Sequence, residues 1–421
     1  MLPLVPGTNW AGNYRYRSAD LRRPTSLAEV RAIVAQSDKV HVLGSRHSFN
    51  DIADTRGTLI SLAALEPELA IAADGRSISV SGGVNYGAVA QLLSPHGLSL
   101  RNYASLPHIS LAGAMSTGTH GSGDRNGCLA TDVLDFDVVL ASGDIRHCSP
   151  ASLGDDFAGT VVSLGALGVI SRVTLAVVPT FEVRQNVYEN LPWHAFEEHF
   201  DEITGYAYSV SMFTDFGPGG IDQLWVKSRV GDRAPDDARA FGARAATGQR
   251  HPIRGMDAIN ATAQLGVAGL PHDRLPHFRI GYTPSNGDEI QSEYLIDRAD
   301  ARLAVIALRR LAPRLAPLLR VAEIRSIAAD DLWLSPSTGR DTVGLHFTWV
   351  RDQAAVEVVL SEIEAVLAPF DARPHWGKLF VASADRLRGS YPMLTRFGEL
   401  ALAWDPDRKF GNDFLNRYLP A

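Results

Sequence analysis

The feature that most constrains the fold is a change of pattern near Pro179. Before that residue, short apolar segments typical of strands and helices alternate quickly along the chain. After it come longer strand-like segments, such as residues 208–216 and 222–230, and two amphipathic helical segments, residues 297–319 and 353–370. A chain of 421 residues is also too long for one compact core. The change of pattern therefore predicts a domain boundary near Pro179.

The first part of the chain is predicted to mix α and β structure. Ser26 and Glu29 have the spacing of a capping box that begins a helix, and a short apolar strand at residues 40–43 follows that helix. Residues 133–148 have the pattern of a β-hairpin, and residues 164–179 begin at a glycine-broken turn and continue as a long strand.

The second part is predicted to be an α+β layer in which helices cover one face of a sheet. The polar, proline-bearing segment from Gly231 to about Pro276 is expected to form loops and surface helices. The aromatic carboxyl end, residues 400–420, is typical of a docking element rather than a loose tail.

Composition excludes several classes of function. The net charge is −7 and the basic residues are scattered, which argues against nucleic acid or an anionic membrane as the partner. The two cysteines, Cys128 and Cys148, have neither zinc-site spacing nor the density of a disulfide framework. The amino end lacks a charged signal region, and no segment approaches the length of a membrane span. We therefore expect a cytoplasmic protein with a small polar ligand and no metal.

A histidine follows the strand at residues 40–43. His47 stands in the run GSRHSFN, where Gly44 and Ser45 break the strand, and ligands are often bound at strand ends. Its surroundings in the sequence leave four roles open: a hydrogen-bonded structural group, a metal ligand, a base, or a point of attachment.

A glycine-rich run extends over residues 105–127. Small residues let backbone N–H groups approach an anion, and Ser116, Thr117 and Thr119 offer further donors, so the run is suited to a pyrophosphate. It is neither a Walker loop nor a GxGxxG motif that follows a strand. By itself it is equally typical of an ordinary glycine-rich turn.

Three strand-like segments of the second part each carry two polar residues at alternate positions. Such residues point to the same face of a sheet, and the pairs are Gln291 with Glu293, Glu323 with Arg325, and His346 with Thr348. A solvated sheet face with surface ion pairs would give the same pattern. Three pairs followed by His375 and Lys378 instead favour a polar site for a polyhydroxylated substrate, with positive charge for a developing alkoxide.

The motifs taken together resemble the alditol (xylitol) oxidases, which belong with the sugar-lactone oxidases to the vanillyl-alcohol-oxidase-like FAD enzymes. The resemblance covers essentially the whole chain in order, through VLGSRHSFND, ASLPHISLAGAMSTGTHGSG, EIRSI, GLHFTW, HWGKLF and DPDRKFGNDF. The GxxHS and TGTHG motifs are typical of the wider branch. Glu323 and Arg325 together with Lys378 point more narrowly to the alditol oxidases.

The resemblance implies a fold and a division of the chain. The implied class is α+β, a two-domain flavoenzyme whose FAD-binding domain has two α+β subdomains and whose substrate-binding domain has an antiparallel sheet covered by helices. The implied limits are residues 1–179 for the FAD-binding domain, 180–372 for the substrate-binding domain, and 373–421 for a segment that returns to the active-site region.

The resemblance also implies roles for individual residues. FAD would be attached covalently through His47, by a single link because residues 102–113 contain no cysteine. The other residues implied to contact FAD are Gly44, Ser45, Arg46, Ser48, Ser105, Ser110, Gly113, Ser116, Thr117, Gly118, His120, Gly121, Val169, Ile170, Thr348 and His375. Those implied to bind substrate are Ser105, Gln291, Glu323, Arg325 and Lys378, with Arg325, Lys378 and His346 as the catalytic residues.

The implied reaction is oxidation of the terminal hydroxyl of an alditol such as xylitol or sorbitol, with O2 reduced to hydrogen peroxide by a monomeric enzyme. Ala104 is small enough to leave room for O2 beside the flavin. The alternatives are an aldonolactone oxidase or dehydrogenase on the same fold, and a flavin- or sugar-binding protein without turnover. A metal-dependent hydrolase using His47, His120, His346 and His375 is disfavoured because these residues lack ligand-pair spacing.

Overall fold

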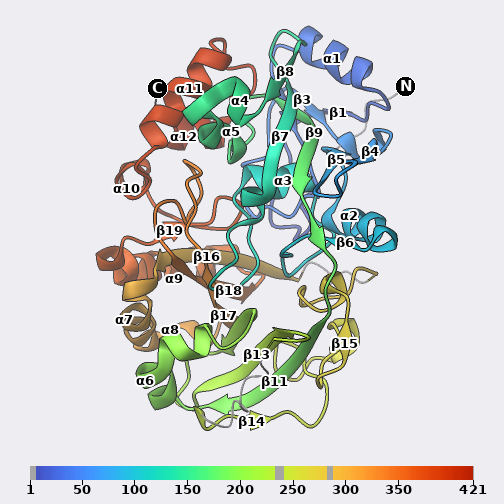
Figure 1. Ribbon diagram of the computed structural model, residues 1–421. Helices are drawn as coiled ribbons and strands as arrows, with labels where there is room; N and C mark the ends of the chain where they lie inside the picture. The colour runs from blue at the N-terminus through green and yellow to red at the C-terminus, as the bar shows by residue number, and fades with distance from the viewer. Residues whose placement is uncertain (1–5, 233–240, 282–287, 421) are drawn as a thin grey trace.

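A computed structural model describes residues 6–232, 241–281 and 288–420 (Figure 1). The expectations for the amino end and for the polar segment after Gly231 fall partly on residues 1–5 and 233–240, which lie outside the described residues. In Figure 1 small sheets occupy the upper part of the molecule and one large sheet occupies the lower part.

Three small sheets form the upper part, as far as the structure describes it. A parallel sheet has the order β1-β3-β2, an antiparallel sheet has the order β4-β5-β9-β7-β8, and β6 pairs with β10. The strands are β1 (Asp20–Arg22), β2 (Val40–Val42), β3 (Thr58–Ile60), β4 (Leu69–Ile71), β5 (Ser77–Ser81), β6 (Leu98–Ser99), β7 (Val133–Val139), β8 (Ile145–Cys148), β9 (Val169–Ala176) and β10 (Val178–Pro179). The helices are α1 (Leu27–Gln36), α2 (Tyr86–Leu93), α3 (Leu111–Ser116), α4 (Pro150–Leu153) and α5 (Phe157–Val161).

The start of α1 shows how the local sequence sets an element. The hydroxyl of Ser26 accepts the N–H of Glu29 at 3.2 Å, as the predicted capping box requires. The Glu29 carboxylate, however, accepts the N–H of Thr25 at 2.7 Å and its hydroxyl at 3.2 Å, not the N–H of Ser26. Only half of the predicted box forms, because Thr25 offers the carboxylate two donors.

One large sheet forms the lower part. Within the described ranges it has nine strands, in the order β14-β11-β13-β12-β17-β18-β16-β19 with β15 paired to β11, and all its pairings are antiparallel. Its strands are β11 (Val183–Leu191), β12 (Ser209–Thr214), β13 (Ile221–Arg229), β14 (Arg244–Ala245), β15 (Ala268–Gly269), β16 (Glu289–Asp297), β17 (Leu319–Ile327), β18 (Thr342–Val350) and β19 (Arg373–Pro374). The helices are α6 (Trp193–Thr204), α7 (Arg298–Arg309), α8 (Ala312–Leu315) and α9 (Gln353–Leu367).

Helices cover one face of this sheet. Along β17 and β18 the apolar residues Ile324, Leu345, Phe347 and Trp349 join a buried core with apolar residues of α6, α7 and α9. The alternate residues point to the opposite face, toward the upper part of the molecule. The alternation of side chains therefore gives the sheet one apolar face and one polar face.

The carboxyl end, with α10 (Ala384–Ser390), α11 (Leu394–Trp404) and α12 (Asp413–Tyr418), returns to the upper part, where Figure 1 places it beside α4 and α5. Val40 of β2 donates its N–H to the carbonyl of Lys409 at 3.0 Å. The side-chain amide of Asn412 donates to the carbonyls of Ile52 and Asp54, each at 2.9 Å. The end of the chain is therefore held beside the strand that leads to His47.

The structure confirms the predicted α+β class and corrects two details. The single helix expected at residues 297–319 is two, α7 and α8, with Pro313 in the first turn of α8, where its missing N–H is tolerated. The described residues between Gly231 and Pro276 form loops, short strands and 3₁₀ turns in place of the expected surface helices. The domain limits at residues 179 and 372 stay a prediction. None of the described helices has the length and apolarity needed to cross a bilayer.

The aromatic core under the sheet gives a stability prediction. Phe347 is fully buried and stacks on Trp349 with ring centroids 5.2 Å apart. We expect Phe347→Ala to lower stability by about 3–5 kcal/mol, because it removes buried area and leaves a cavity. Val358→Ala on the exposed side of α9, where the residue is 58% exposed, is the control and should change little. Thermal unfolding measures both, and equal melting temperatures for the two variants would contradict the packing described above.

Candidate functional site

A cavity of about 400 Å³ lies where the small sheets meet the polar face of the large sheet. From the first part of the chain it is lined by the loop after β2 and by much of the glycine-rich run. From the large sheet it is lined by the polar residues of β16, β17 and β18, and the segment after β19 adds His375 and Lys378. The sequence motifs that were separate along the chain therefore meet around one cavity.

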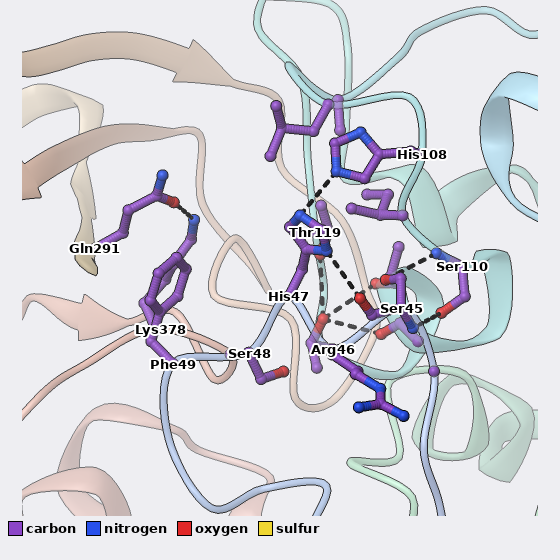
Figure 2. Close-up of a pocket in the computed structure, with 18 of the residues that line it drawn as sticks. Ser45, Arg46, His47, Ser48, Phe49, His108, Ser110, Thr119, Gln291 and Lys378 are labelled. Atoms are coloured by element: carbon purple, nitrogen blue, oxygen red, sulfur yellow. Dashed lines mark hydrogen bonds between the residues drawn. The ribbon is translucent and has the colours of Figure 1, made fainter. Parts of the chain in front are cut away.

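The loop after β2 is tied to the glycine-rich run. The N–H of Ser45 donates to the hydroxyl of Ser110 at 3.3 Å, and the N–H of Ser110 donates to the hydroxyl of Ser45 at 3.2 Å (Figure 2). Arg46 has a φ of 63°, in the left-handed region, and its guanidinium donates to the carbonyls of Pro6 and Thr8. This turn of the backbone presents the next residue, His47, to the cavity.

His47 is held as a neutral imidazole. Its Nδ1 lies 3.0 Å from the carbonyl oxygen of Ser45 and its Nε2 lies 2.7 Å from Nε2 of His108 (Figure 2). Its ring stacks on Trp10 with centroids 5.0 Å apart. Burial, and then the neighbouring His108, lower the pKa of His47 to about 3. A neutral imidazole has a lone pair and is a competent nucleophile.

His108 is a cavity residue that the sequence analysis quoted within a motif but gave no role. Its second ring nitrogen, Nδ1, is buried and makes no hydrogen bond to any described residue. The histidine in the run SLPHIS was visible in the sequence, but its contact with His47, 61 residues away, depends on the fold.

The glycine-rich run contains the short helix α3, and two glycines keep its start open. A Cβ on Gly44 would lie 2.5 Å from the Ser110 hydroxyl oxygen, and one on Gly113 would lie 2.7 Å from the same atom. A side chain at either position would therefore clash with the wall of the cavity. This close approach is the physical reason for glycine at these two positions.

Most of the residues predicted to contact a cofactor line the cavity. They are Gly44, Ser45, Arg46, His47, Ser48, Ser105, Ser110, Gly113, Ser116, Thr117, His120, Ile170, Thr348 and His375. Gly118, Gly121 and Val169 are not among the lining residues. Gly118 packs on Pro336, Gly121 packs on Tyr103 and Asn102, and Val169 is buried in the apolar core with α1.

The polar pairs of the large sheet share one face, as predicted. His346 on β18 pairs with Glu293 of β16 on one side and with Glu323 of β17 on the other, and Gln291 pairs with Thr348. The register therefore places an imidazole between two carboxylates across three adjacent strands.

Arg325 has two carboxylate partners. Its Nη2 donates to Oε1 of Glu293 at 2.8 Å and its Nη1 donates to the Ser105 hydroxyl at 3.0 Å, whereas Glu323 lies 3.7 Å away. Glu323 lies on the same strand as Arg325, β17, and Glu293 lies on β16, two strands away in the sheet. Burial opposes ionisation of Glu293, but Arg325, His120 and His346 lower its pKa well below the usual range.

Glu323 has a partner of its own that the sequence analysis did not identify. Its Oε1 accepts from Nε2 of His277 at 2.8 Å, and Nδ1 of His277 lies 3.1 Å from Nζ of Lys227. Burial would raise the pKa of Glu323, but Arg325 and then His277 lower it overall. Glu323 is therefore an ionised carboxylate at the edge of the cavity.

Lys378 enters the cavity from the segment after β19. Its Nζ donates to the side-chain carbonyl of Gln291 (Figure 2), and burial lowers its pKa to about 8. Asn50 donates its side-chain amide to the backbone carbonyls of Trp376 and Lys378, each at 2.8 Å. The loop that carries His47 and the segment that carries Lys378 are therefore held together.

The lining suits a flavin nucleotide. The wall of small residues and hydroxyls allows close approach of phosphates, and the cavity continues to the polar sheet face where a ring system would meet the substrate. Two buried polar atoms, Nδ1 of His108 and Nε of Arg325, have no hydrogen-bond partner in the described part of the chain. No group of three His, Cys, Asp or Glu side chains there has the arrangement of a metal site, and both cysteines are buried free thiols.

Comparisons with known proteins agree with this assignment. The FAD binding domain family matches residues 20–149, and the D-arabinono-1,4-lactone oxidase family matches residues 286–418. An alditol oxidase of Streptomyces sp. (strain IKD472 / FERM P-14339) is 46% identical over 98% of this chain and 98% of its own. The L-gulono-1,4-lactone dehydrogenase of Mycobacterium tuberculosis (strain ATCC 25618 / H37Rv) is 29% identical over 98% of each chain.

A solved structure, cholesterol oxidase from B. sterolicum, superposes with a TM-score of 0.77 and covers 100% of both chains. It is 14% identical to this chain, so the likeness concerns the fold alone.

The buried histidines predict how stability depends on pH. Burial lowers the pKa of His375 to about 3, from 6.5 in an exposed chain. The unfolded protein therefore binds a proton that the folded protein does not, so this contribution is complete above pH 6.5 and is lost as the pH falls toward 3.

We expect the free energy of unfolding, and with it the melting temperature, to fall as the pH is lowered from 7 to 5. His375→Gln should reduce the slope of the free energy of unfolding by up to about 1.4 kcal/mol per pH unit. Thr348→Val, a buried neighbour without an ionisable group, is the control and should shift the whole curve without changing its slope. An unchanged slope for His375→Gln would contradict a buried neutral His375.

Proposed function

Because this chain belongs to the vanillyl-alcohol-oxidase-like family of FAD enzymes, in the branch of alditol and sugar-lactone oxidases, we propose that it oxidises the terminal hydroxyl of alditols such as xylitol or sorbitol. The alcohol loses two electrons and two protons to become the aldose, and O2 gains them to become hydrogen peroxide. The observation that supports this most strongly is the meeting of Gln291, Glu323, Arg325, His346 and Lys378 at one cavity beside His47.

FAD is the cofactor of this family, and when bound it supplies the acceptor for the hydride of the carbinol carbon. We propose that His47 is its covalent tether, since His47 lines the cavity and its imidazole is neutral and therefore nucleophilic. The hydroxyls of Ser110, Ser116 and Thr117 would contact the pyrophosphate. Ala104 lines the cavity with a small side chain that leaves room for O2.

The polar residues have two separate roles: some bind the substrate hydroxyls, and others stabilise the reacting oxygen. Glu323 is an ionised acceptor for substrate hydroxyls, and Gln291 offers an amide for the same purpose. Arg325 holds a fixed positive charge, and Lys378 adds a second donor next to it. These donors are in place before the reaction, so they stabilise the developing alkoxide without a cost of reorganisation.

His346 is the candidate acceptor for the hydroxyl proton. Burial, and then Lys378, lower its pKa, so the imidazole is neutral. Its Nδ1 faces the Glu293 carboxylate at 3.4 Å, and its Nε2 lies 3.4 Å from the Thr348 hydroxyl. A carboxylate only accepts hydrogen bonds, so the proton belongs on Nδ1 and the lone pair on Nε2, beside that hydroxyl. A proton released by the substrate would be taken up at Nε2.

An aldonolactone oxidase or dehydrogenase is the second candidate. It is favoured by the match of residues 286–418 to the D-arabinono-1,4-lactone oxidase family. The preferred substrate distinguishes the alditol oxidase from the aldonolactone enzyme. An open-chain polyol can turn several hydroxyls toward Glu323 and Gln291, whereas the ring of a lactone fixes where its hydroxyls point.

Peroxide release from a panel of xylitol, sorbitol, L-gulono-1,4-lactone and a secondary alcohol tests the proposal. We expect the highest kcat/KM for the alditols and peroxide equal to the alcohol consumed. Preference for the lactone would favour the second candidate. Turnover only with an artificial electron acceptor would indicate a dehydrogenase, and no turnover of any compound would leave a binding protein. We also propose that the enzyme is monomeric and cytoplasmic. Gel filtration checks the oligomeric state, and cell fractionation checks the location.

Lys378→Ala tests the role of the lysine beside Gln291. Loss of a preorganised donor should lower kcat for xylitol by about 100-fold or more, while FAD stays bound. Lys39→Ala, which removes an exposed lysine that does not line the cavity and that donates to the carbonyls of Asp407 and Arg408, is the control. Steady-state kinetics with flavin absorbance measure both effects, and wild-type turnover by Lys378→Ala would refute the assignment.

His47→Ala tests the tether. The wild-type protein should keep its yellow colour in the pellet after acid precipitation, and the variant should release its flavin to the supernatant, because the nucleophilic nitrogen is gone. Arg22→Ala, an exposed substitution on β1, should behave as wild type. Colour that stays in the His47→Ala pellet would place the attachment at another residue.

A further inference from the structure

A buried chain of polar groups lies behind Glu323 and is not part of the proposed catalytic set. Lys227 on β13 is 1% exposed, and its Nζ lies 3.1 Å from Nδ1 of His277. Nε2 of the same imidazole lies 2.8 Å from Oε1 of Glu323. The three residues are well separated in the sequence, and the fold brings them into one line that ends at the cavity.

The donors and acceptors of this chain permit one arrangement. An ammonium group only donates hydrogen bonds, and that of Lys227 has three acceptors: the carbonyls of Leu275 at 2.5 Å and Pro276 at 3.3 Å, and Nδ1 of His277. With Nδ1 as an acceptor, the proton of the neutral imidazole is on Nε2, which donates to Glu323. Burial lowers the pKa of Lys227 to about 7. The tautomer of His277 is set from both sides, because the Glu323 carboxylate can only accept at Nε2 and Lys227 donates to Nδ1.

The chain is enclosed by aromatic rings. The His277 ring meets Phe213 and Trp225 edge to face, with ring centroids 5.4 Å and 5.3 Å away. Burial, and then Lys227, lower the pKa of His277 to about 4, so the imidazole stays neutral. In surroundings with so little water, a hydrogen bond to a carboxylate is strong and holds its orientation.

His277 also fixes the other wall of the substrate site. Its backbone N–H donates to the carbonyl of Ser105 at 3.2 Å, and the N–H of Phe278 donates to the same oxygen at 3.3 Å. The hydroxyl of Ser105 in turn accepts from Arg325 at 3.0 Å. His277 therefore holds Glu323 through its side chain, and through its backbone it holds Ser105, whose hydroxyl binds Arg325.

We propose that Lys227 and His277 are positioning residues that fix the orientation of the Glu323 carboxylate, with one oxygen occupied by His277 and the other turned to a substrate hydroxyl. This inference rests on the proposed function and deepens it. The substrate class is an alcohol with at least one hydroxyl beyond the reacting one, which would donate to the second oxygen of Glu323; that oxygen, Oε2, lies 3.7 Å from Nη1 of Arg325 and makes no closer contact to it.

The test is a double-mutant cycle on the holoenzyme with xylitol as substrate. We expect His277→Phe to raise KM about ten- to a hundredfold, because it removes a buried hydrogen bond to a charged group, and to change kcat less than about threefold. His277→Gln retains a donor to Glu323 and should stay within about threefold of wild type. Lys227→Met, which removes the donor to Nδ1 of His277, should fall between these two variants.

The cycle separates positioning from folding. If His277 acts through Glu323, adding His277→Phe to Glu323→Ala should cause no further loss of kcat/KM. Gln185→Leu is the matched control: Gln185 lies opposite Lys227 on the neighbouring strand and anchors the same loop through Thr262 at 3.1 Å, but it makes no hydrogen bond to His277. Its KM should equal that of wild type. If His277→Phe does not fold, the KM of Lys227→Met is compared with that of His277→Gln instead.

Additive losses in the cycle, or an equal KM defect in Gln185→Leu, would overturn the positioning role while the wild-type activity stands. If wild type oxidises the lactone instead, the proposed function fails and the same cycle on the lactone tests the positioning role alone. If wild type oxidises neither compound, both proposals fall.

Discussion

The site depends on the burial of one carboxylate, Glu293. It is 1% exposed and contacts Arg325 at 2.8 Å, His120 at 3.3 Å and His346 at 3.4 Å. A charge so deeply buried is tolerated only with partners that offset its lost hydration, so the residues around it are fixed in place. His120 comes from the glycine-rich run and the other partners come from the large sheet. Glu293 thus connects the proposed cofactor wall to the proposed substrate wall.

Around this carboxylate the protein separates charged groups from neutral ones. Glu293, Glu323 and Arg325 are ionised because they face opposite charges, whereas burial lowers the pKa of His375 and keeps it neutral. Charged groups fix the electric field at the cavity, and neutral imidazoles are available to accept protons or hydrogen bonds. This arrangement is complete in the folded chain, which is the condition for electrostatic stabilisation of a reacting oxygen.

Local pattern was enough to predict much of this. The period of two along β16, β17 and β18 placed the polar residues on one face, and the small residues near Ser110 indicated a wall open to phosphate. Local pattern failed where a residue's neighbours come from far away in the chain. Gly121 and Val169 matched a cofactor motif but do not line the cavity, and their contact with FAD stays a prediction. His277 and Lys227 belong to no sequence motif, because their proposed role depends on a contact with each other that only the folded chain makes.

The sequence by itself determined which side chains share a face of the sheet and which loops can approach a phosphate, because both follow from backbone geometry over a few residues. Only the tertiary structure decided the partners of each charge. Arg325 hydrogen-bonds to Glu293 at 2.8 Å and forms a longer ion pair with Glu323 at 3.7 Å, because strand order and register set the distances across a sheet. Electrostatic and hydrogen-bond energies depend on those distances and on burial, and neither quantity exists until the chain has folded.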